Sequence, residues 1–159
     1  PLLTEKAEER ASGKTAEDTQ KAATGEKALE ESLEKKKYPG VEGEFLESSL
    51  LKDIHFGFDR YDLTPKAREV LSQNAELLLK HSRVNIQIEG HCDERGTIEY
   101  NLALGDRRST SAEQYLIALG VSPNRILTIS YGEEMPVDPG HSEEAWAKNR
   151  RAHFVVVSR

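Results

Sequence analysis

The chain has 159 residues, of which 36% are hydrophobic and 31% are charged. Since one hydrophobic core commonly serves roughly 100 to 200 residues, this length allows one domain and some additional chain. The 28 acidic side chains outnumber the 22 basic ones, and the net charge of −6 gives no electrostatic basis for a nucleic-acid partner. No apolar run approaches the roughly 20 residues that cross a bilayer, and no signal peptide is recognised at Pro1.

The first part of the chain differs in composition from the rest. Nearly half of residues 1–37 are charged, no aromatic residue occurs among them, and leucines are sparse. Such a segment cannot bury enough apolar surface to offset the entropy that ordering costs. We therefore predict a flexible charged tether over residues 1–45 and one folded domain over residues 46–159.

Within this domain, patterns typical of strands alternate with patterns typical of helices. Strands are expected where apolar and polar residues alternate, and helices where a Thr or Ser suited to the N-cap precedes a helical stretch. In chain order we predict a strand at 53–58, a helix from Thr64 to about Lys80, a strand at 84–89, a helix from Thr97 to Gly120, a strand at 126–131, a short helix after Ser142 and a strand at 152–157. This alternation indicates an α/β layer structure, with helices packed on a small sheet.

Residues 90–108, GHCDERGTIEYNLALGDRR, gather many polar side chains between a predicted strand and a predicted helix. His91, Cys92, Asp93 and Glu94 are all potential metal ligands, but adjacent residues of a strand point in different directions. Zinc sites usually use ligand pairs that are roughly two to four residues apart, and Cys92 is the only cysteine of the chain. The sequence therefore predicts no metal site.

The same segment does not predict catalysis. Cys92 directly follows His91, whereas a Cys–His pair requires the base to face the sulfur across space. The adjacent acids Asp93 and Glu94 are of a type that is mostly solvent-exposed. We therefore expect the protein not to be an enzyme.

A third interpretation of this segment is the recognition of a ligand that carries both signs of charge. Asp93 follows a predicted strand, where binding residues often lie. Asn101, Leu104 and Arg108 share one helix face, which can bring Arg108 back toward Asp93. Together the carboxylate would accept from an ammonium and the guanidinium would hold a carboxylate. The alternative is that Asp93 and Arg108 pair with each other, and their spacing favours neither.

Four ordered blocks carry a family resemblance: FGFDRYDL, GHCDERGTIEYNLALGDRR, RILTISYGEEMP and GHSEEAWAKNRRA. Over roughly residues 50 to 159 the chain resembles the peptidoglycan-binding domain of the OmpA family, and more closely its lipoprotein branch. The resemblance implies an α+β sandwich with a small mixed four-stranded sheet and helices packed on it. It also implies a noncatalytic module, without a cofactor, that binds the diaminopimelate residue of the peptidoglycan stem peptide.

The resemblance also assigns residues to the ligand site. The family Asp falls on Asp93 and the family Arg on Arg108. Further pocket positions that the resemblance implies are Phe58, Asp59, Arg95, Gly96, Thr97 and Leu104, with Asn101 as a supporting residue. From the residues alone, Phe58 and Leu104 would be core residues, and Asp59 would cap a turn.

Neighbouring arginines and aromatic residues are expected to have other roles. Arg107 points about 100° away from Arg108 on a helix and is expected at the surface. Arg151 is expected to be a structural or rim charge, while Tyr131 and Trp146 are expected to pack in the interior.

The resemblance further implies a cell-envelope setting. Proteins of the lipoprotein branch carry an acylated N-terminal Cys, whereas the printed sequence begins at Pro1. Attachment to the periplasmic side of the outer membrane through a lipid is thus an expectation from resemblance, as are the partners TolB and the Tol inner-membrane proteins. The alternatives are another OmpA-like envelope protein, such as the periplasmic domain of a flagellar stator, and a periplasmic peptidoglycan hydrolase.

Overall fold

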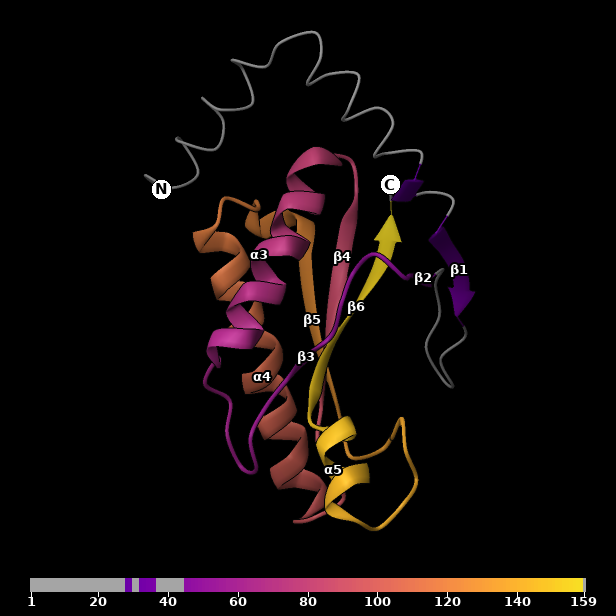
Figure 1. Cartoon of the computed structure of the whole chain (residues 1–159), viewed down its shortest axis with the longest axis vertical. Coiled ribbons are helices and arrows are strands. Elements are labelled where there is room, and N and C mark those ends of the chain that lie inside the picture. Colours follow the sequence, from indigo (N-terminus) through magenta and orange to yellow (C-terminus); the bar gives the residue numbers. More distant parts are fainter. Residues whose placement is uncertain (1–27, 30–31, 37–44, 159) are drawn as a thin grey trace, which may run out of the picture.

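A mixed β-sheet with two long helices on one side forms the centre of the computed structural model, which describes residues 28–29, 32–36 and 45–158 (Figure 1). The described elements are β1 (Leu33–Lys36), β2 (Phe45–Ser48), β3 (Ile54–His55), α3 (Pro65–Lys80), β4 (Asn85–His91), α4 (Ile98–Ala118), a short 3-10 turn (Pro123–Arg125), β5 (Ile126–Gly132), α5 (Glu143–Asn149) and β6 (Arg151–Ser158). Figure 1 shows α5 and the beginning of α4 at the same end of the sheet.

The strands are arranged in the order β1-β2-β6-β4-β5, and β3 also pairs with β6. β4 is parallel to β5 and antiparallel to β6, so the sheet is mixed. α4 connects the parallel strands β4 and β5, as such a crossover requires. β2 and β3 pair with different parts of β6, β2 at Val155 and Val156 and β3 at Arg151 and Ala152.

The mixed α/β fold predicted from the sequence is confirmed, including its helices. Each predicted N-cap side chain accepts a hydrogen bond from the backbone N–H three residues further along the chain: Thr64 at 3.1 Å, Thr97 at 3.1 Å and Ser142 at 3.2 Å. These caps satisfy N–H groups that have no partner within the helix. They fix where α3, α4 and α5 begin.

The first predicted strand is shorter than expected. Of residues 53–58, only Ile54 and His55 form β3, although the N–H of Phe56 still donates to the carbonyl oxygen of Arg150 at 2.9 Å. The chain then turns, with the N–H of Arg60 donating to Gly57 O at 3.2 Å, and Asp59 takes a φ of 56°. This turn replaces the end of the predicted strand and carries Phe58 away from the core.

The sheet of the described residues has six strands rather than the predicted four. The additional strands, β1 and β2, lack the alternation of apolar and polar residues by which a strand is recognised. β1 lies within the segment expected to be tether, and Leu29 just before it is buried in the core. The rest of that expected tether, residues 1–27, 30–31 and 37–44, lies outside the described residues.

The core lies between the sheet and the helices α3 and α4. It includes Ile86 and Ile88 of β4, Phe154 and Val156 of β6, Leu71 and Leu78 of α3, and Ala112 and Leu116 of α4. In the part of the chain that the structure describes, no helix combines the length and the apolar character needed to span a membrane.

Two glycines bring α4 directly onto the end of β4. A Cβ atom at Gly90 would lie 1.7 Å from the carbonyl oxygen of Gly105, and one at Gly105 would lie 2.9 Å from Gly90 O. At such distances a side chain at either position would force the two backbones apart. The backbones of β4 and α4 are therefore in contact immediately next to His91 and one helical turn before Arg108.

A buried ionic cluster joins β2 and the residue before β3 to β6. His153 binds Asp53 Oδ1 through Nδ1 at 2.6 Å and Glu47 Oε1 through Nε2 at 2.7 Å, and Arg151 Nη1 donates to Asp53 Oδ2 at 2.7 Å. Burial lowers the pKa of His153, but its hydrogen bonds to the two carboxylates outweigh that effect and raise the pKa to about 9. Arg151 is thus a structural charge of this cluster.

Candidate ligand-binding site

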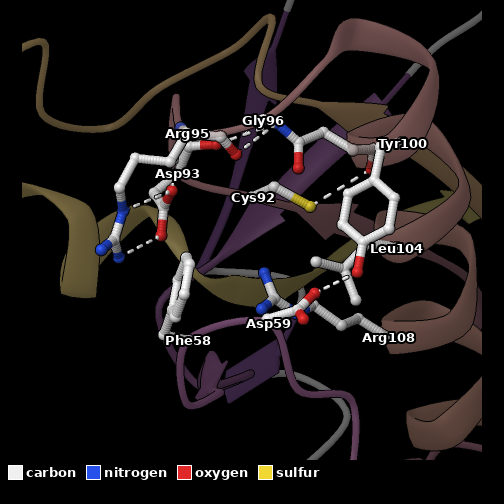
Figure 2. A pocket seen from close by; sticks show the side chains of 10 residues that line it. Phe58, Asp59, Cys92, Asp93, Arg95, Gly96, Tyr100, Leu104 and Arg108 are labelled. Carbon is white, nitrogen blue, oxygen red and sulfur yellow. Dashed lines mark hydrogen bonds and ion pairs between the residues drawn. The ribbon is translucent and has the colours of Figure 1, made fainter.

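A pocket of about 190 Å³ opens where the end of β4, the beginning of α4 and the turn after β3 meet (Figure 2). Its lining consists of Phe58, Asp59, Cys92, Asp93, Arg95, Gly96, Tyr100, Asn101, Leu104 and Arg108. All residues that the sequence assigned to a ligand site lie here, except Thr97, which caps α4. The pocket therefore brings together segments that are far apart in the sequence.

Arg108 is the most deeply buried charge of the pocket, with 1% of its surface exposed. Its guanidinium donates to three backbone carbonyl groups: Nε to Arg60 O at 2.8 Å, Nη1 to His91 O at 2.9 Å and Nη2 to Gly57 O at 3.1 Å. These bonds hold the side chain between the end of β4 and the turn after β3. A guanidinium has five N–H groups, so Nη1 and Nη2 each retain one further donor.

No carboxylate of the described residues forms an ion pair with Arg108 within 4.0 Å. Burial lowers the pKa of Arg108, but a guanidinium remains charged in proteins. Buried charges are usually paired, because leaving water is costly. The carbonyl dipoles compensate Arg108 in part, and the site is suited to an additional anion.

Asp93 carries the opposite charge and is 4% exposed. Its Oδ1 accepts from the backbone N of Arg95 at 3.0 Å and from Arg95 Nε at 3.2 Å, and its Oδ2 accepts from Arg95 Nη2 at 3.0 Å. Burial raises the pKa of Asp93, but the hydrogen bonds from Arg95 outweigh burial, and the pKa lies below its ordinary value. The carboxylate is therefore ionised at neutral pH.

Of the two interpretations that spacing left open, the direct pair between Asp93 and Arg108 is not what the structure forms. Asp93 instead pairs with Arg95 and, at 3.4 Å, with Arg150 Nη1. Arg150 is buried, and its Nε donates to Phe56 O at 2.9 Å. The acid and Arg108 thus lie in one pocket with separate partners.

Arg150 was not predicted from the sequence, which drew attention to Arg151 instead. The sequence signal that could have identified Arg150 is that neighbouring residues at the start of a strand point to opposite faces of the sheet. Arg151 lies in the ionic cluster with Asp53, while Arg150 points to Asp93. Two adjacent arginines at the start of a strand therefore carry their charges to opposite faces of the sheet.

Arg95 contacts two aromatic rings at the pocket rim. Its guanidinium carbon is 3.9 Å from the ring centre of Phe58 and 4.2 Å from that of Trp146. Figure 2 shows this guanidinium facing the carboxylate of Asp93, with Phe58 close by. Phe58 is 56% exposed, so the core role that its alternating pattern suggests is wrong, and its ring instead contacts Arg95.

Tyr100 is a pocket residue that was not predicted. Its hydroxyl group donates a short hydrogen bond to Asp59 Oδ1 across the mouth of the pocket (Figure 2). Tyr100, Leu104 and Arg108 follow one another at intervals of four residues on α4, which places them on one helix face. That spacing is the signal by which Tyr100 could have been found.

Asn101 holds the loop between β4 and α4. Its Nδ2 donates to the carbonyl oxygens of Arg95 at 3.1 Å and Asp93 at 3.3 Å, and to Glu133 Oε1 at 3.2 Å. Gly96 in this loop has a φ of 105°, a conformation that suits glycine. These features fix the backbone that presents Asp93 and Arg95.

Cys92 lines the pocket but is a poor nucleophile. Its Sγ donates to Asn101 O at 3.2 Å, and burial raises the pKa of its thiol to about 11. The reactive thiolate is thus scarce at neutral pH. Among the described residues, no three His, Cys, Asp or Glu side chains are grouped as a metal site would need.

The sequence matches the OmpA family over residues 55–150. It is 45% identical over 117 residues to the peptidoglycan-associated lipoprotein of Pseudomonas aeruginosa, a match that covers 72% of this chain and 69% of that protein. It is 46% identical over 99 residues to the Haemophilus influenzae protein of the same name, covering 62% of this chain and 65% of that protein. The chain thus spans about two thirds of the length of these relatives.

A solved structure is similar as well. The crystal structure of the peptidoglycan-associated lipoprotein from Burkholderia pseudomallei superposes with a TM-score of 0.64 and 42% sequence identity. The superposition covers 65% of this chain and 88% of that one. The matched family region, residues 55–150, contains every residue that lines the pocket.

Proposed function

This chain belongs to the OmpA family, in the branch of the peptidoglycan-associated lipoproteins, and we propose that it is a noncatalytic module that binds peptidoglycan. In this proposal the pocket recognises the diaminopimelate residue of the stem peptide. The free end of that residue carries both an ammonium and a carboxylate. Binding would connect the cell wall to the envelope layer in which this protein is held.

The observation that carries the proposal is the pair of buried opposite charges that share a pocket without binding each other. No carboxylate of the described residues pairs with Arg108, which retains a donor on each terminal nitrogen, and this suits bidentate binding of a ligand carboxylate. Asp93, held by the adjacent loop, is ionised and suits a ligand ammonium. A zwitterionic head group carries one charge suited to each of them.

The size of the pocket supports a small ligand group. Its volume of about 190 Å³ corresponds to roughly six water molecules at ~30 Å³ each. That space is enough for the end of one amino acid. The two charges of the pocket, which an uncharged sugar ring cannot match, lead us to assign the stem peptide, and not the glycan strand, to the pocket.

We also propose the cellular setting that the relatives suggest. Their name describes lipoproteins associated with peptidoglycan, and by analogy this chain would act on the periplasmic side of the outer membrane with a lipid anchor. Function in the Tol system, with TolB and the Tol inner-membrane proteins as partners, is part of the same proposal. The protonated state of Cys92 supports a binding role without a nucleophile.

Calorimetric titration with two stem peptides tests the proposal. One peptide contains diaminopimelate, and the control contains lysine, which keeps the side-chain ammonium but lacks the adjacent carboxylate. We expect the diaminopimelate peptide to bind at least about tenfold more tightly, since only its carboxylate can reach Arg108; that factor corresponds to about 1.4 kcal/mol. Equal affinities, or binding of neither peptide, would contradict the proposed recognition.

A further inference from the structure

The carboxylate of Asp93 has no room for an additional donor. A carboxylate offers about four lone-pair positions. Asp93 already accepts three hydrogen bonds from Arg95, through its backbone N, Nε and Nη2, and a fourth contact from Arg150. A ligand ammonium can therefore bind Asp93 only if one of these donors leaves.

The two arginines differ in how firmly they are held. Arg150 is buried and has further partners, Phe56 O at 2.9 Å and Glu143 Oε1 at 3.0 Å. The side chain of Arg95 is 31% exposed, and beyond Asp93 its ionic contact among the described residues is Glu143 Oε2 at 3.6 Å. Arg95 is therefore the donor that can leave.

We propose that Arg95 is a resident cation that the ammonium of the ligand replaces at Asp93, and that the released guanidinium transfers to Glu143. The rings of Phe58 and Trp146 both contact the guanidinium, so its movement toward Glu143 changes its position relative to both rings. Glu143 is 66% exposed and already near. This inference rests on the proposed function, because it names how that site accepts its ligand.

The exchange has a consequence for specificity. Without the Arg95 side chain, the buried carboxylate of Asp93 would keep only the 3.4 Å contact with Arg150 and the bond from the Arg95 backbone N. Under-compensating a buried charge is costly, so the Arg95 side chain leaves only when another cation arrives. A ligand that offers a carboxylate alone reaches Arg108 but does not displace Arg95. Arg95 thus makes the pocket selective for a group that carries both charges, in addition to the selection by Asp93 and Arg108 themselves.

The fluorescence of Trp146 provides a direct test. It is the only tryptophan of the chain, and its ring lies 4.2 Å from the Arg95 guanidinium carbon. We expect a saturating diaminopimelate-containing tripeptide to change the emission of the wild-type protein. In Arg95→Gln, which has no guanidinium to displace, the peptide should bind at least as tightly by calorimetry, without that change in emission.

The outcomes separate this inference from the proposed function. If the wild-type protein shows no heat of binding, the proposed function fails. If it binds while its emission stays constant, or if Arg95→Gln shows the same change in emission, the exchange is refuted. If Arg95→Gln loses binding, Arg95 is a ligand contact and not a resident competitor.

A pair of neighbouring glutamates supplies a matched control. Glu143→Gln removes the acceptor for the released Arg95 and also a partner of Arg150. It should weaken peptide binding by up to about fivefold, the factor typical of an exposed ion pair, in the wild-type protein but not in Arg95→Gln, where no guanidinium is released. Glu144→Gln changes the next residue, which is also exposed, and should leave the affinity unaltered. Equal affinities of the two variants would argue against transfer to Glu143.

Discussion

Arg108 Nη1 donates a hydrogen bond of 2.9 Å to the carbonyl oxygen of His91, so the buried cation of α4 is attached to the strand end that precedes Asp93. The position of one charge is therefore set by the backbone that carries the other. The close contact between Gly90 and Gly105 makes this bond possible, since it brings α4 onto β4. Perturbing either the charge or the contact should change ligand binding in a defined way.

Replacing Arg108 by Lys should weaken binding to isolated sacculi and to the diaminopimelate peptide by about tenfold or more. Lysine keeps the charge, but its ammonium has three donors and no planar fork, so it cannot bind the carbonyl groups and a carboxylate together. Arg107→Lys is the matched control, because Arg107 is the exposed neighbour. Calorimetry measures the affinities; equal binding by both variants would remove Arg108 from the site.

Asp93→Asn should abolish peptide binding while retaining the shape of the side chain. The amide cannot compensate an ammonium, and the loss expected for a buried charge pair is on the order of 2–5 kcal/mol. Asp62→Asn provides a control, since Asp62 pairs with Arg60 at the surface. Sacculus pull-down and circular dichroism measure binding and folding; a folded Asp93→Asn variant that still sediments with sacculi would contradict the prediction.

Stability should fall as the pH rises toward 9. The pKa of His153 is raised from 6.5 to about 9 by its two carboxylate partners, so folding favours its protonated form. The stabilisation is complete below about pH 6.5 and is lost as the pH passes about 9, a change of at most about 3 kcal/mol. Urea unfolding between pH 6 and 9.5 measures it.

His153→Gln provides the comparison for that pH series. Without the imidazolium the variant should be less stable at pH 6 than the wild-type protein, and its free energy of unfolding should vary less between pH 6.5 and 9. A wild-type curve that stays level over this interval would show that folding does not raise the pKa of His153.

Gly105→Ala should destabilise the fold by about 1–3 kcal/mol, the usual cost of overpacking, and should weaken peptide binding as well. The new Cβ would lie 2.2 Å from Ser130 Oγ and 2.9 Å from Gly90 O, so α4 must move away from β4. Adding Ser130→Ala removes the first contact and should restore part of the lost stability. Thermal unfolding of the single and double variants measures the loss of stability and its partial recovery, and calorimetry measures peptide binding. An unchanged melting temperature for Gly105→Ala would contradict the prediction.

The sequence predicted the elements whose limits are set locally. Thr64, Thr97 and Ser142 cap helices by bonds to residues three positions away, and such short-range chemistry is visible in a sequence. The strands β1 and β2 depend instead on pairing with each other and with β6. Their own residues carry no alternating pattern, so sequence reasoning missed them.

The same distinction between local and long-range contacts applies to the candidate site. Helical and strand spacing brought Arg108 and Asp93 into one pocket, because backbone periodicity fixes where each side chain starts. The partners of Asp93 could not be deduced, since Arg95 and Arg150 have long flexible side chains whose ends reach several alternative acceptors. Only the packed structure decides that Arg150 points to Asp93 and Arg151 to Asp53.

β2 and β3 pair with different stretches of the same edge of β6. This pairing affects the solubility of the protein. An unpaired strand presents a row of free N–H and C=O groups that can recruit other chains and start aggregation. β6 is the longest of the described strands, with eight residues, and β2 covers it at Val155 and Val156. A fragment that begins after Ser48 would uncover this backbone, and its copies would be prone to associate with one another.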